Sequence, residues 1–307
     1  MQKKPNISRQ AAKAQRLAKK ISLRILCPDA SGSLRVLFIV ALILILSPIV
    51  SLSQQTRNDS LSKPHNGVAA PLRVVSNPAF SAGEKLTFLV HYGPLVAGNA
   101  RLSVPEIVNV NGRPCYKIIS EMWSNKFFSS MFKIDDRVES HTDVDGLFSW
   151  WFSKRLREGD HRNEHVVNFD QINHLAVMEK GGKIDTLAVP PFVQDVLSAI
   201  YFLRTMKLMP GDTIHIPNHS DGKLFDLKVV VHKREKVQTK AGKFSCLAVE
   251  PFLKTSGLFQ QKGRLIIHMT DDQRKMPVMI TSQLYVKAFK LGAIVAELEK
   301  MEGVPKK

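Results

Sequence analysis

The sequence has 307 residues, and 44% of them are hydrophobic, which is enough for the core of one large domain or of two ordinary ones. The formal net charge of +17 would favour nucleic-acid binding in a cytosolic protein. Residues 1–53, however, hold nine Lys or Arg residues and one acidic residue around an apolar segment, and positive charge orients such a segment in a membrane. The charge distribution therefore argues for export of the body of the chain and against a nucleic-acid partner.

Residues 36–52, VLFIVALILILSPIVSL, form an uncharged apolar run near the lower limit for spanning a bilayer and slightly long for a signal-peptide core. The small residues Ser51 and Ser53 form an acceptable cleavage pattern, although the region ahead of the run is longer than in an ordinary signal peptide. Cleaved or retained, the run leaves the basic residues in the cytoplasm and the body outside it. We therefore expect a periplasmic body, either anchored in the inner membrane through residues 36–53 or released after cleavage near Ser53.

The chain is thus predicted to have one folded domain behind three N-terminal segments. Residues 54–80 are rich in Ser, Asn, Pro and Gln, a composition typical of a linker. The predicted organisation is a basic cytoplasmic extension (1–35), a signal peptide or transmembrane anchor (36–53), a linker (54–80) and a single antiparallel β domain (81–301).

From residue 81 onward, short alternating segments are separated by turn signals. Residues 86–92, LTFLVHY, alternate between two faces as a β-strand does, and another strand is expected at 97–104. Such hairpin-length links favour an antiparallel sheet of roughly a dozen strands. Several strands are apolar on both faces, which suits either a sandwich or a half-barrel, that is, a strongly curved sheet around a helix. Dipeptides typical of tight turns recur at Asn111-Gly112, Asp145-Gly146, Gly181-Gly182 and Asp221-Gly222.

One segment of the body, PPFVQDVLSAIYFLRTMKLMPGD (190–212), is clearly helical. Pro190-Pro191 ends the strand before it, because proline cannot donate to a β-ladder. Asp195 is placed to cap the helix, since its carboxylate can accept from the free N–H groups of the first turn. The helix is expected to end before Pro210-Gly211. One helix face is formed by Leu197, Ile200, Tyr201 and Arg204.

This helix allows two interpretations. An apolar stripe usually packs onto a core, so the helix would plug one end or face of the sheet. Alternatively, Tyr201 and Arg204 point into a ligand cavity, because arginine is seldom buried without an anionic partner. Asp195 is one candidate for that partner. Tyr201, Arg204 and Asp195 are therefore the predicted ligand-binding residues.

The cysteines allow two interpretations as well. Cys115 and Cys246 lie in strand-like runs, and export would permit a disulfide between them. The alternative is two separate buried thiols, because free cysteine packs as a small hydrophobe. No cysteine spacing resembles a zinc site, so the sequence predicts neither a metal nor a cofactor.

Other polar groups carry only weak signals for chemistry. His161 and His165 in HRNEH would be two metal ligands on a helix, but in the hairpin and strand expected there they lie about 13 Å apart. The acidic pairs Asp135-Asp136 and Asp271-Asp272 could serve acid–base catalysis, but neighbours in a strand face opposite sides, so neither pair forms a dyad alone. The sequence has no nucleophile elbow, phosphate-binding loop or dinucleotide fingerprint. We therefore assign no catalytic residue and no metal ligand.

Tryptophans suggest sugar stacking only weakly. Trp150 and Trp151 are adjacent in a strand-like run, so they must face opposite sides of the sheet. One of them is expected in the core and the other at the surface.

The order and spacing of several segments resemble a bacterial family known only as the domain of unknown function numbered 3108. The resemblance covers about residues 82–300 and implies an exported or envelope-associated protein with a mainly antiparallel β domain and no established activity. The long basic extension departs from the family pattern and bears on signal cleavage. The segments that carry the resemblance are AGEKLTFLVHYGPLVAGNARL, DDRVESHTDVDGLFSWWF, QDVLSAIYFLRTMKLMPGD, KREKVQTKAGKFSCLAVEP, TDDQRKMPVMI and LGAIVAELE.

Together these observations favour a non-enzymatic envelope protein whose extracytoplasmic β domain binds a lipid, a glycan or another envelope protein. One alternative is an envelope hydrolase that uses carboxylates such as Asp136 or Asp272. Another is a structural or assembly factor that acts through its surface without a small ligand.

Overall fold

The structure is a computed structural model, and it describes residues 73–252, 263–286 and 289–306. The predicted cytoplasmic extension, the predicted signal or anchor segment and most of the predicted linker lie outside these residues. Within the described part of the chain, no helix is long and apolar enough to cross a membrane.

The described residues form fifteen strands and two helices. The helices are α3 (Lys126–Ser129) and α4 (Val196–Thr205). The strands are β1 (Glu84–Tyr92), β2 (Leu95–Val104), β3 (Ile107–Val110), β4 (Arg113–Ser124), β5 (Asp135–Asp143), β6 (Ser149–Glu158), β7 (His161–Asp170), β8 (Leu175–Lys180), β9 (Lys183–Ala188), β10 (Thr213–Ser220), β11 (Lys223–Thr239), β12 (Gly242–Phe252), β13 (Gly263–Thr270), β14 (Pro277–Val286) and β15 (Phe289–Glu302).

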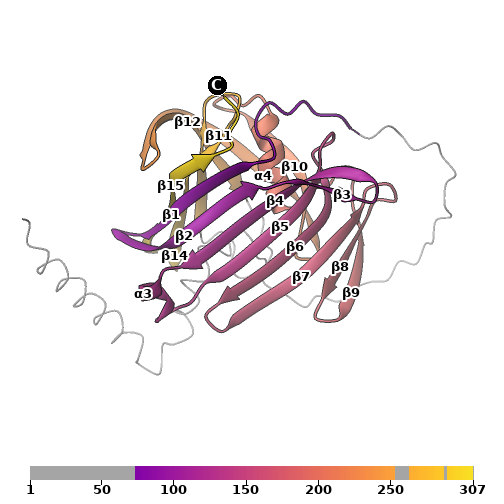
Figure 1. The fold of residues 1–307 in the computed structure, drawn as a ribbon, viewed down its shortest axis with the longest axis horizontal. Coiled ribbons are helices and arrows are strands. Elements are labelled where there is room, and N and C mark those ends of the chain that lie inside the picture. Colours follow the sequence, from indigo (N-terminus) through magenta and orange to yellow (C-terminus); the bar gives the residue numbers. More distant parts are fainter. Residues whose placement is uncertain (1–72, 253–262, 287–288, 307) are drawn as a thin grey trace, which may run out of the picture.

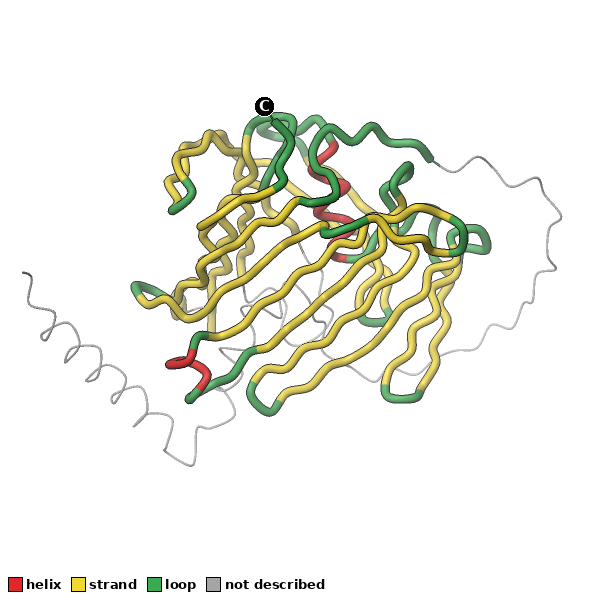
Figure 2. The backbone as a smooth tube through the Cα atoms, viewed as in Figure 1, coloured by secondary structure: helices red, strands yellow, loops and turns green. Residues whose placement is uncertain are grey.

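All of these strands belong to one sheet, and each neighbouring pair is antiparallel (Figure 2). The order is β10-β11-β12-β13-β14-β15-β1-β2-β4-β5-β6-β7-β8-β9, with β3 paired to β4 beside this path. The first and last strands, β1 and β15, are therefore hydrogen-bonded in the interior of the sheet. The two edges are β9 and β10, which are consecutive in the chain. The sheet would close into a barrel at these edges, and α4 lies in the connection between them.

The sheet curves so that β1–β9 form one face and β10–β13 lie behind it, with α4 between the two (Figure 1). This confirms the predicted curved antiparallel sheet with one packed helix. Because there is a single sheet, the half-barrel describes the fold better than the sandwich. The short helix α3, between β4 and β5, is an element that the sequence pattern does not predict.

Tight turns place the strands as the dipeptide signals predict. Asn111 and Gly112 have φ values of 52° and 83° and connect β3 to β4. Asp221 and Gly222, with φ values of 47° and 75°, connect β10 to β11. Asn, Asp and Gly are the residues that tolerate this left-handed conformation, and two of them in succession favour a two-residue hairpin.

The core is divided by α4 rather than lying on one side of it. Leu197 and Tyr201 belong to a hydrophobic cluster formed with β2 and β4–β8. Leu203 belongs to a second cluster formed with β10–β13, and Phe202 contacts both. The predicted face is therefore one of two buried sides of the helix, because a helix between two halves of a curved sheet must be apolar on both sides. Burial of each such side chain contributes about 1.5–3 kcal/mol to stability.

The helix begins at the predicted cap and ends, as predicted, before Pro210-Gly211. Asp195 is the N-cap, and Met206 follows the last helical turn in an extended conformation. The helix therefore ends five residues before Pro210, which leaves room for Leu208 to enter the second cluster. A proline only forbids a longer helix, and burial of an apolar side chain can end it sooner.

Part of the predicted linker is folded onto this core. Ala79 and Phe80 are buried in the cluster of the first half of the sheet. Arg73 donates hydrogen bonds to the carbonyls of Gly146 and Leu147 and stacks on the ring of Phe202, 4.4 Å from its centroid. The ordered domain therefore begins before the predicted boundary at residue 81.

Candidate functional site

Arg204, one of the predicted ligand-binding residues, is fully buried and bound to a carboxylate of the protein itself. Its Nη1 and Nη2 atoms donate to Glu84 Oε1 and Oε2 at 2.6 and 2.7 Å. Its Nε donates to the carbonyl of Arg274 at 3.2 Å. Burial alone would lower the pKa of Arg204, but the charge and hydrogen bonds of Glu84, together with Tyr201, outweigh burial and raise the pKa. The expectation that Asp195 is the anionic partner of Arg204 is therefore wrong, because Glu84 at the start of β1 takes that position.

Tyr201, the second predicted residue, lies beside this ion pair. Its ring stacks against the Arg204 guanidinium, 4.9 Å from the centroid, and packs edge-on against Phe80. Burial, together with the nearby carboxylate of Glu84, raises the pKa of Tyr201 far above its usual range. The phenol therefore stays neutral in the core.

Asp195, the third predicted residue, caps α4 and also fastens it to the sheet. Its Oδ1 accepts from the backbone N–H groups of Leu197 and Ser198 at 2.7 and 2.9 Å. Its Oδ2 accepts from the hydroxyls of Ser140 and Ser149 at 2.5 and 2.6 Å. Burial raises the pKa of Asp195 in spite of these hydrogen bonds. The predicted cap is confirmed, and all three predicted residues contribute contacts that hold α4 in place.

Both described cysteines are free thiols. Cys115 is buried beside Phe148 and Trp150, whereas Cys246 is buried in a different cluster with Leu86 and Phe88. The structure therefore contains the second of the two predicted arrangements, separate buried thiols, and no disulfide among the residues that it describes.

Trp150 is buried and donates through Nε1 to Asp143, whereas Trp151 is half-buried on the opposite face and stacks on His141. The predicted split of the two tryptophans is confirmed. Asp135 and Asp136 divide in the same way: Asp135 pairs with Arg155 at the surface, while Asp136 points inward. Asp272 is held by Arg274 and Thr270.

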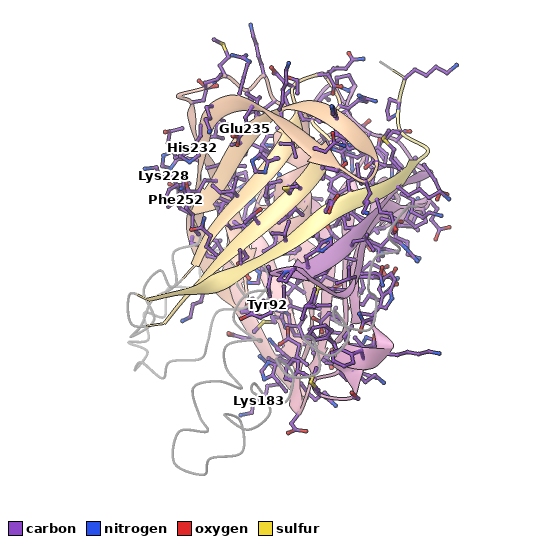
Figure 3. The ribbon with its side chains drawn as sticks, turned by 90° about the vertical axis from the view of Figure 1, so that its left-hand side faces the viewer. Tyr92, Lys183, Lys228, His232, Glu235 and Phe252 are labelled. Atoms are coloured by element: carbon purple, nitrogen blue, oxygen red, sulfur yellow. The ribbon has the colours of Figure 1, made fainter. Side chains whose placement is uncertain are left out.

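Charged side chains on the outer face of the sheet are paired with one another. Lys228 of β11 lies over the ring of Phe252 at 5.5 Å, at one margin of the molecule (Figure 3). On the same strand, His232 bonds to Glu250, and Glu235 bonds to His268. These pairs are partly buried, and each of them joins neighbouring side chains of the sheet. They give no sign of a site.

The inner face is different, because it carries buried polar residues within an apolar alternation. On β6, Phe152 and Leu156 belong to the core cluster, and Lys154 and Glu158 share their face. Polar residues share the inner face in the same way on β5, where Asp136 is beside Val138, on β7, where His165 is beside Val167, and on β10, where Asn218 is beside Ile216. We call this set the inner polar seam, and it consists of Asp136, Lys154, Glu158, His165, Asn218 and Asp221, all of which are buried except the partly buried Asp221.

An ion pair at the seam joins the turn after the edge strand β10 to β6, in the other half of the sheet. Lys154 Nζ of β6 lies 2.5 Å from Oδ1 of Asp221, in the turn after β10. His165 is the cross-strand neighbour of Lys154, and its Nε2 lies 3.7 Å from the same oxygen, too far for a hydrogen bond. Nearby, His219 packs edge-on against Phe169 of β7. These side-chain contacts connect β10 and its turn to the inner face of β6 and β7.

Burial keeps the two histidines at the seam neutral. Burial, and then the charge of Lys154, lowers the pKa of His165 to about 3. Burial lowers the pKa of His219 to about 4. Burial also lowers the pKa of Lys154, although Asp221 opposes this shift. At neutral pH each imidazole therefore has one N–H donor and one acceptor nitrogen.

Two carboxyl groups at the end of the seam interact closely. Burial, and then the neighbouring Asp136, raises the pKa of Glu158 to about 9. Burial raises the pKa of Asp136 to about 6, although the backbone N–H of Arg157 donates to its Oδ1 at 2.8 Å. The pair therefore keeps one proton across the neutral range.

Several polar atoms of the seam have no hydrogen-bond partner within the described residues. They are both ring nitrogens of His165 and both amide atoms of Asn218. Asp136 and Glu158 do not belong with them, because their carboxyl groups share a hydrogen bond. Buried polar groups are nearly always hydrogen-bonded, and one left unpaired costs about 1–3 kcal/mol. The seam is therefore equipped to bind a polar group, and this makes it the candidate functional site.

The sequence pattern alone does not reveal this seam. In the sequence, His165 stands out only as one half of a histidine pair, Asp136 only as one of two adjacent acids and Asp221 only as a turn residue. The usable signal is the alternation in FSKRLRE, where Lys154 and Glu158 occupy the same face as Phe152 and Leu156. A charged residue on the apolar face of a strand is rare enough to mark a site.

Comparison with solved structures gives five similar chains, and three of them, all of low sequence identity, are described below. One is a β-barrel-like protein of the domain of unknown function DUF1849 from Brucella abortus, with 10% identity, a TM-score of 0.47 and coverage of 77% of this chain and 100% of that one. The second is a Bacteroides fragilis protein with a YmcC-like fold, presumed to be exported, with 13% identity, a TM-score of 0.26 and coverage of 77% and 100%. The third is a Parabacteroides distasonis protein presumed to be a lipoprotein, with 10% identity, a TM-score of 0.28 and coverage of 73% and 96%.

No curated protein matches this chain. The family described as "Protein of unknown function (DUF3108)" matches residues 87–298, which extend from β1 to β15 and include α4 and the whole inner polar seam. This agrees with the resemblance seen in the sequence, and the chain belongs to the DUF3108 family.

Proposed function

We propose that this chain is an extracytoplasmic protein of the cell envelope that binds an amphiphilic molecule, such as a lipid or glycolipid, at the inner face of its curved sheet. The observation that carries the proposal is the inner polar seam, where unpartnered polar atoms lie within an apolar face. A ligand with a polar end and an apolar chain has the chemistry to satisfy both surfaces. The charged groups of Arg204 and Asp195 are already bonded within the protein, so the seam is the better place for contact.

Location in the envelope is supported by the sequence of the N-terminal segment. Basic residues precede an uncharged apolar run, and this order leaves the following domain outside the cytoplasm. Protease added to spheroplasts of an expressing Gram-negative host is expected to digest the β domain while a cytoplasmic marker survives. Digestion only after lysis of the inner membrane would contradict the proposed location.

Ligand binding is tested by native mass spectrometry of the full chain, transferred from the host membrane into an amphipathic polymer so that no detergent competes. We expect an adduct that organic extraction removes and that fragments as a lipid. The same chain, unfolded in denaturant and refolded without lipid, is the control and is expected to carry no adduct. If the wild-type chain had the mass of the polypeptide alone in every preparation, this result would contradict the proposal.

A second candidate function is hydrolysis by the Asp136 and Glu158 carboxyl groups. The observation that favours it is the pair of raised pKa values, because an acid that stays protonated near neutral pH can serve as a general acid. Both groups are buried, however, so a substrate must first reach the inner face. Release of 4-nitrophenol from glycoside and ester substrates by the wild-type chain, lost in Glu158→Gln and kept in the exposed control Glu164→Gln, would support hydrolysis. Equal background rates for all three proteins would exclude it for these substrates.

A further inference from the structure

We infer that the inner polar seam binds a neutral, hydroxyl-rich head group, of the kind found in glycosyl or glycerol moieties, through His165 and Asn218. The inference rests on the proposed function and specifies the polar end of the ligand. It begins from two buried side chains, His165 on β7 and Asn218 on β10, whose polar atoms all lack a hydrogen-bond partner in the described ranges of the chain.

The first argument is the type of hydrogen-bonding group. A neutral imidazole offers one donor and one acceptor, and a side-chain amide offers both as well. A hydroxyl group can donate and accept at the same time, so it can satisfy either side chain in either orientation. Carboxylates and phosphates only accept, and ammonium groups only donate. A set that mixes donors and acceptors therefore matches hydroxyls better than it matches any ion.

The second argument is charge. Lys154 is the only buried cation of the seam, and Asp221 already neutralises it at 2.5 Å. Lys180, whose charge also acts on Lys154 and His165, lies partly exposed at the end of β8. An anionic head group would have to displace Asp221 and would meet the carboxyl pair of Asp136 and Glu158. A cationic head group would meet Lys154. A buried charge without a new partner is costly, so a neutral head group is the one that the seam accommodates.

The third argument is position. Asn218 forms an isolated parallel bridge with Gln194, next to the cap of α4, so it lies where the connection into the helix meets the edge strand β10. Its neighbour His219 packs against Phe169, and Ile216 belongs to the cluster on the other side of α4. A head group held here would be flanked by apolar side chains of both halves of the core. An attached apolar chain could therefore extend from it without crossing a charged region.

The test uses native mass spectrometry of the full chain in an amphipathic polymer, after lipid removal, with one probe at a time. The probes are n-dodecyl-β-maltoside below its micelle concentration, dodecylphosphocholine with the same chain and no hydroxyl, and maltose with the same head and no chain. The variants are His165→Leu and Asn218→Leu, with His161→Leu as the control, because His161 lies exposed on the same strand.

We expect the maltoside to bind the wild type at least about fivefold more tightly than the phosphocholine, as the loss of one or two good hydrogen bonds requires. Each seam variant should lose that preference, whereas His161→Leu should keep it. The melting temperature of both seam variants without ligand should stay equal or rise, because each substitution removes unpartnered polar atoms from the interior. A fall of the melting temperature in both variants, with the preference intact, would show a structural role and overturn the inference.

Other outcomes separate the head group from the rest of the ligand. Maltose could bind the wild type as tightly as the maltoside does and bind both seam variants more weakly. This result would support the hydroxyl-rich head group but assign it to a free glycan. It would contradict the apolar part of the proposed function. Equal binding of the two dodecyl probes to wild type and variants overturns the head-group inference and leaves the proposed function standing. Binding of none of the three probes overturns both, and the seam would then hold ordered water only.

Discussion

Arg204 of α4 and Glu84 at the start of β1 are 120 residues apart and form a fully buried ion pair with two hydrogen bonds of 2.6 and 2.7 Å. The planar guanidinium matches the carboxylate in both distance and direction, so the pair fixes the orientation of the helix as well as its position. Through this ion pair, α4, which lies in the connection between the edge strands β9 and β10, is bonded to β1 in the interior of the sheet. Arginine on an apolar helix face is therefore a structural anchor here.

Loss of one partner of this pair should be costly. Arg204→Met leaves Glu84 buried without its cation, so the free energy of unfolding is expected to fall by about 3–5 kcal/mol. The double variant Glu84→Gln/Arg204→Met removes both charges and should recover a large part of that loss. Urea unfolding followed by circular dichroism measures both, with Lys85→Met as the control because Lys85 is an exposed neighbour of Glu84. A single variant as stable as the control would refute the anchoring role.

The helix cap should contribute more than an ordinary cap does. Asp195→Ala removes the acceptor for two backbone N–H groups, which alone costs about 1 kcal/mol. It also leaves the buried hydroxyls of Ser140 and Ser149 without their acceptor, and each stranded group adds about 1–3 kcal/mol. Asp195→Asn, which keeps an oxygen at this position, should be milder. If thermal unfolding gave the two variants the same small loss, the hydroxyl contacts would be unimportant for stability.

The Lys154–Asp221 pair should hold the edge strand β10 onto β6 in the other half of the sheet. In a double-mutant cycle of Lys154→Met and Asp221→Asn, the two losses should not add, with a coupling of about 1–3 kcal/mol. Asparagine tolerates the left-handed backbone at position 221, where φ is 47°, so the turn itself is preserved. Hydrogen exchange of β10 should also accelerate in Lys154→Met. Unchanged exchange, together with additive losses, would mean that β10 is held by other contacts.

Glu158 should make the protein less stable as pH rises. Its pKa is 4.5 in the unfolded chain and about 9 in the folded one, so the folded state holds more protons between these values. The free energy of unfolding therefore decreases with rising pH through this window. Glu158→Gln lacks this loss, so its stability relative to wild type should increase between about pH 5 and about pH 9. Histidines 165 and 219 act in the opposite direction at lower pH in both proteins, so they cancel in the difference.

Denaturation in urea at several pH values gives the difference between wild type and Glu158→Gln directly. Glu164→Gln, which changes an exposed carboxylate on β7, serves as the control and should show no such trend. A constant difference across the range would mean that Glu158 ionises in the folded protein as an ordinary carboxyl does.

The two buried thiols should be unreactive in the native protein. Burial raises the pKa of both Cys115 and Cys246 to about 12, and the thiolate is the reactive form. Iodoacetamide at neutral pH is expected to label neither residue until denaturant is added. Mass spectrometry of peptides containing these residues distinguishes this result from a disulfide, which would block labelling in denaturant as well.

Local patterns in the sequence determined the elements. Period-two alternation indicated the strands, Asn-Gly and Asp-Gly pairs set the turns, and Asp195 marked the start of the helix, because each of these preferences acts over a few residues. The family could be recognised for the same reason, since it rests on the order and spacing of such segments. Only the tertiary structure decided which residues meet. Glu84 meets Arg204, and Lys154 meets Asp221, because the sheet curves around α4, and curvature accumulates over many strands rather than within any one of them. The sequence does not show whether the partner of a charged residue lies two or 120 residues away. The candidate site could therefore be identified only in the folded chain.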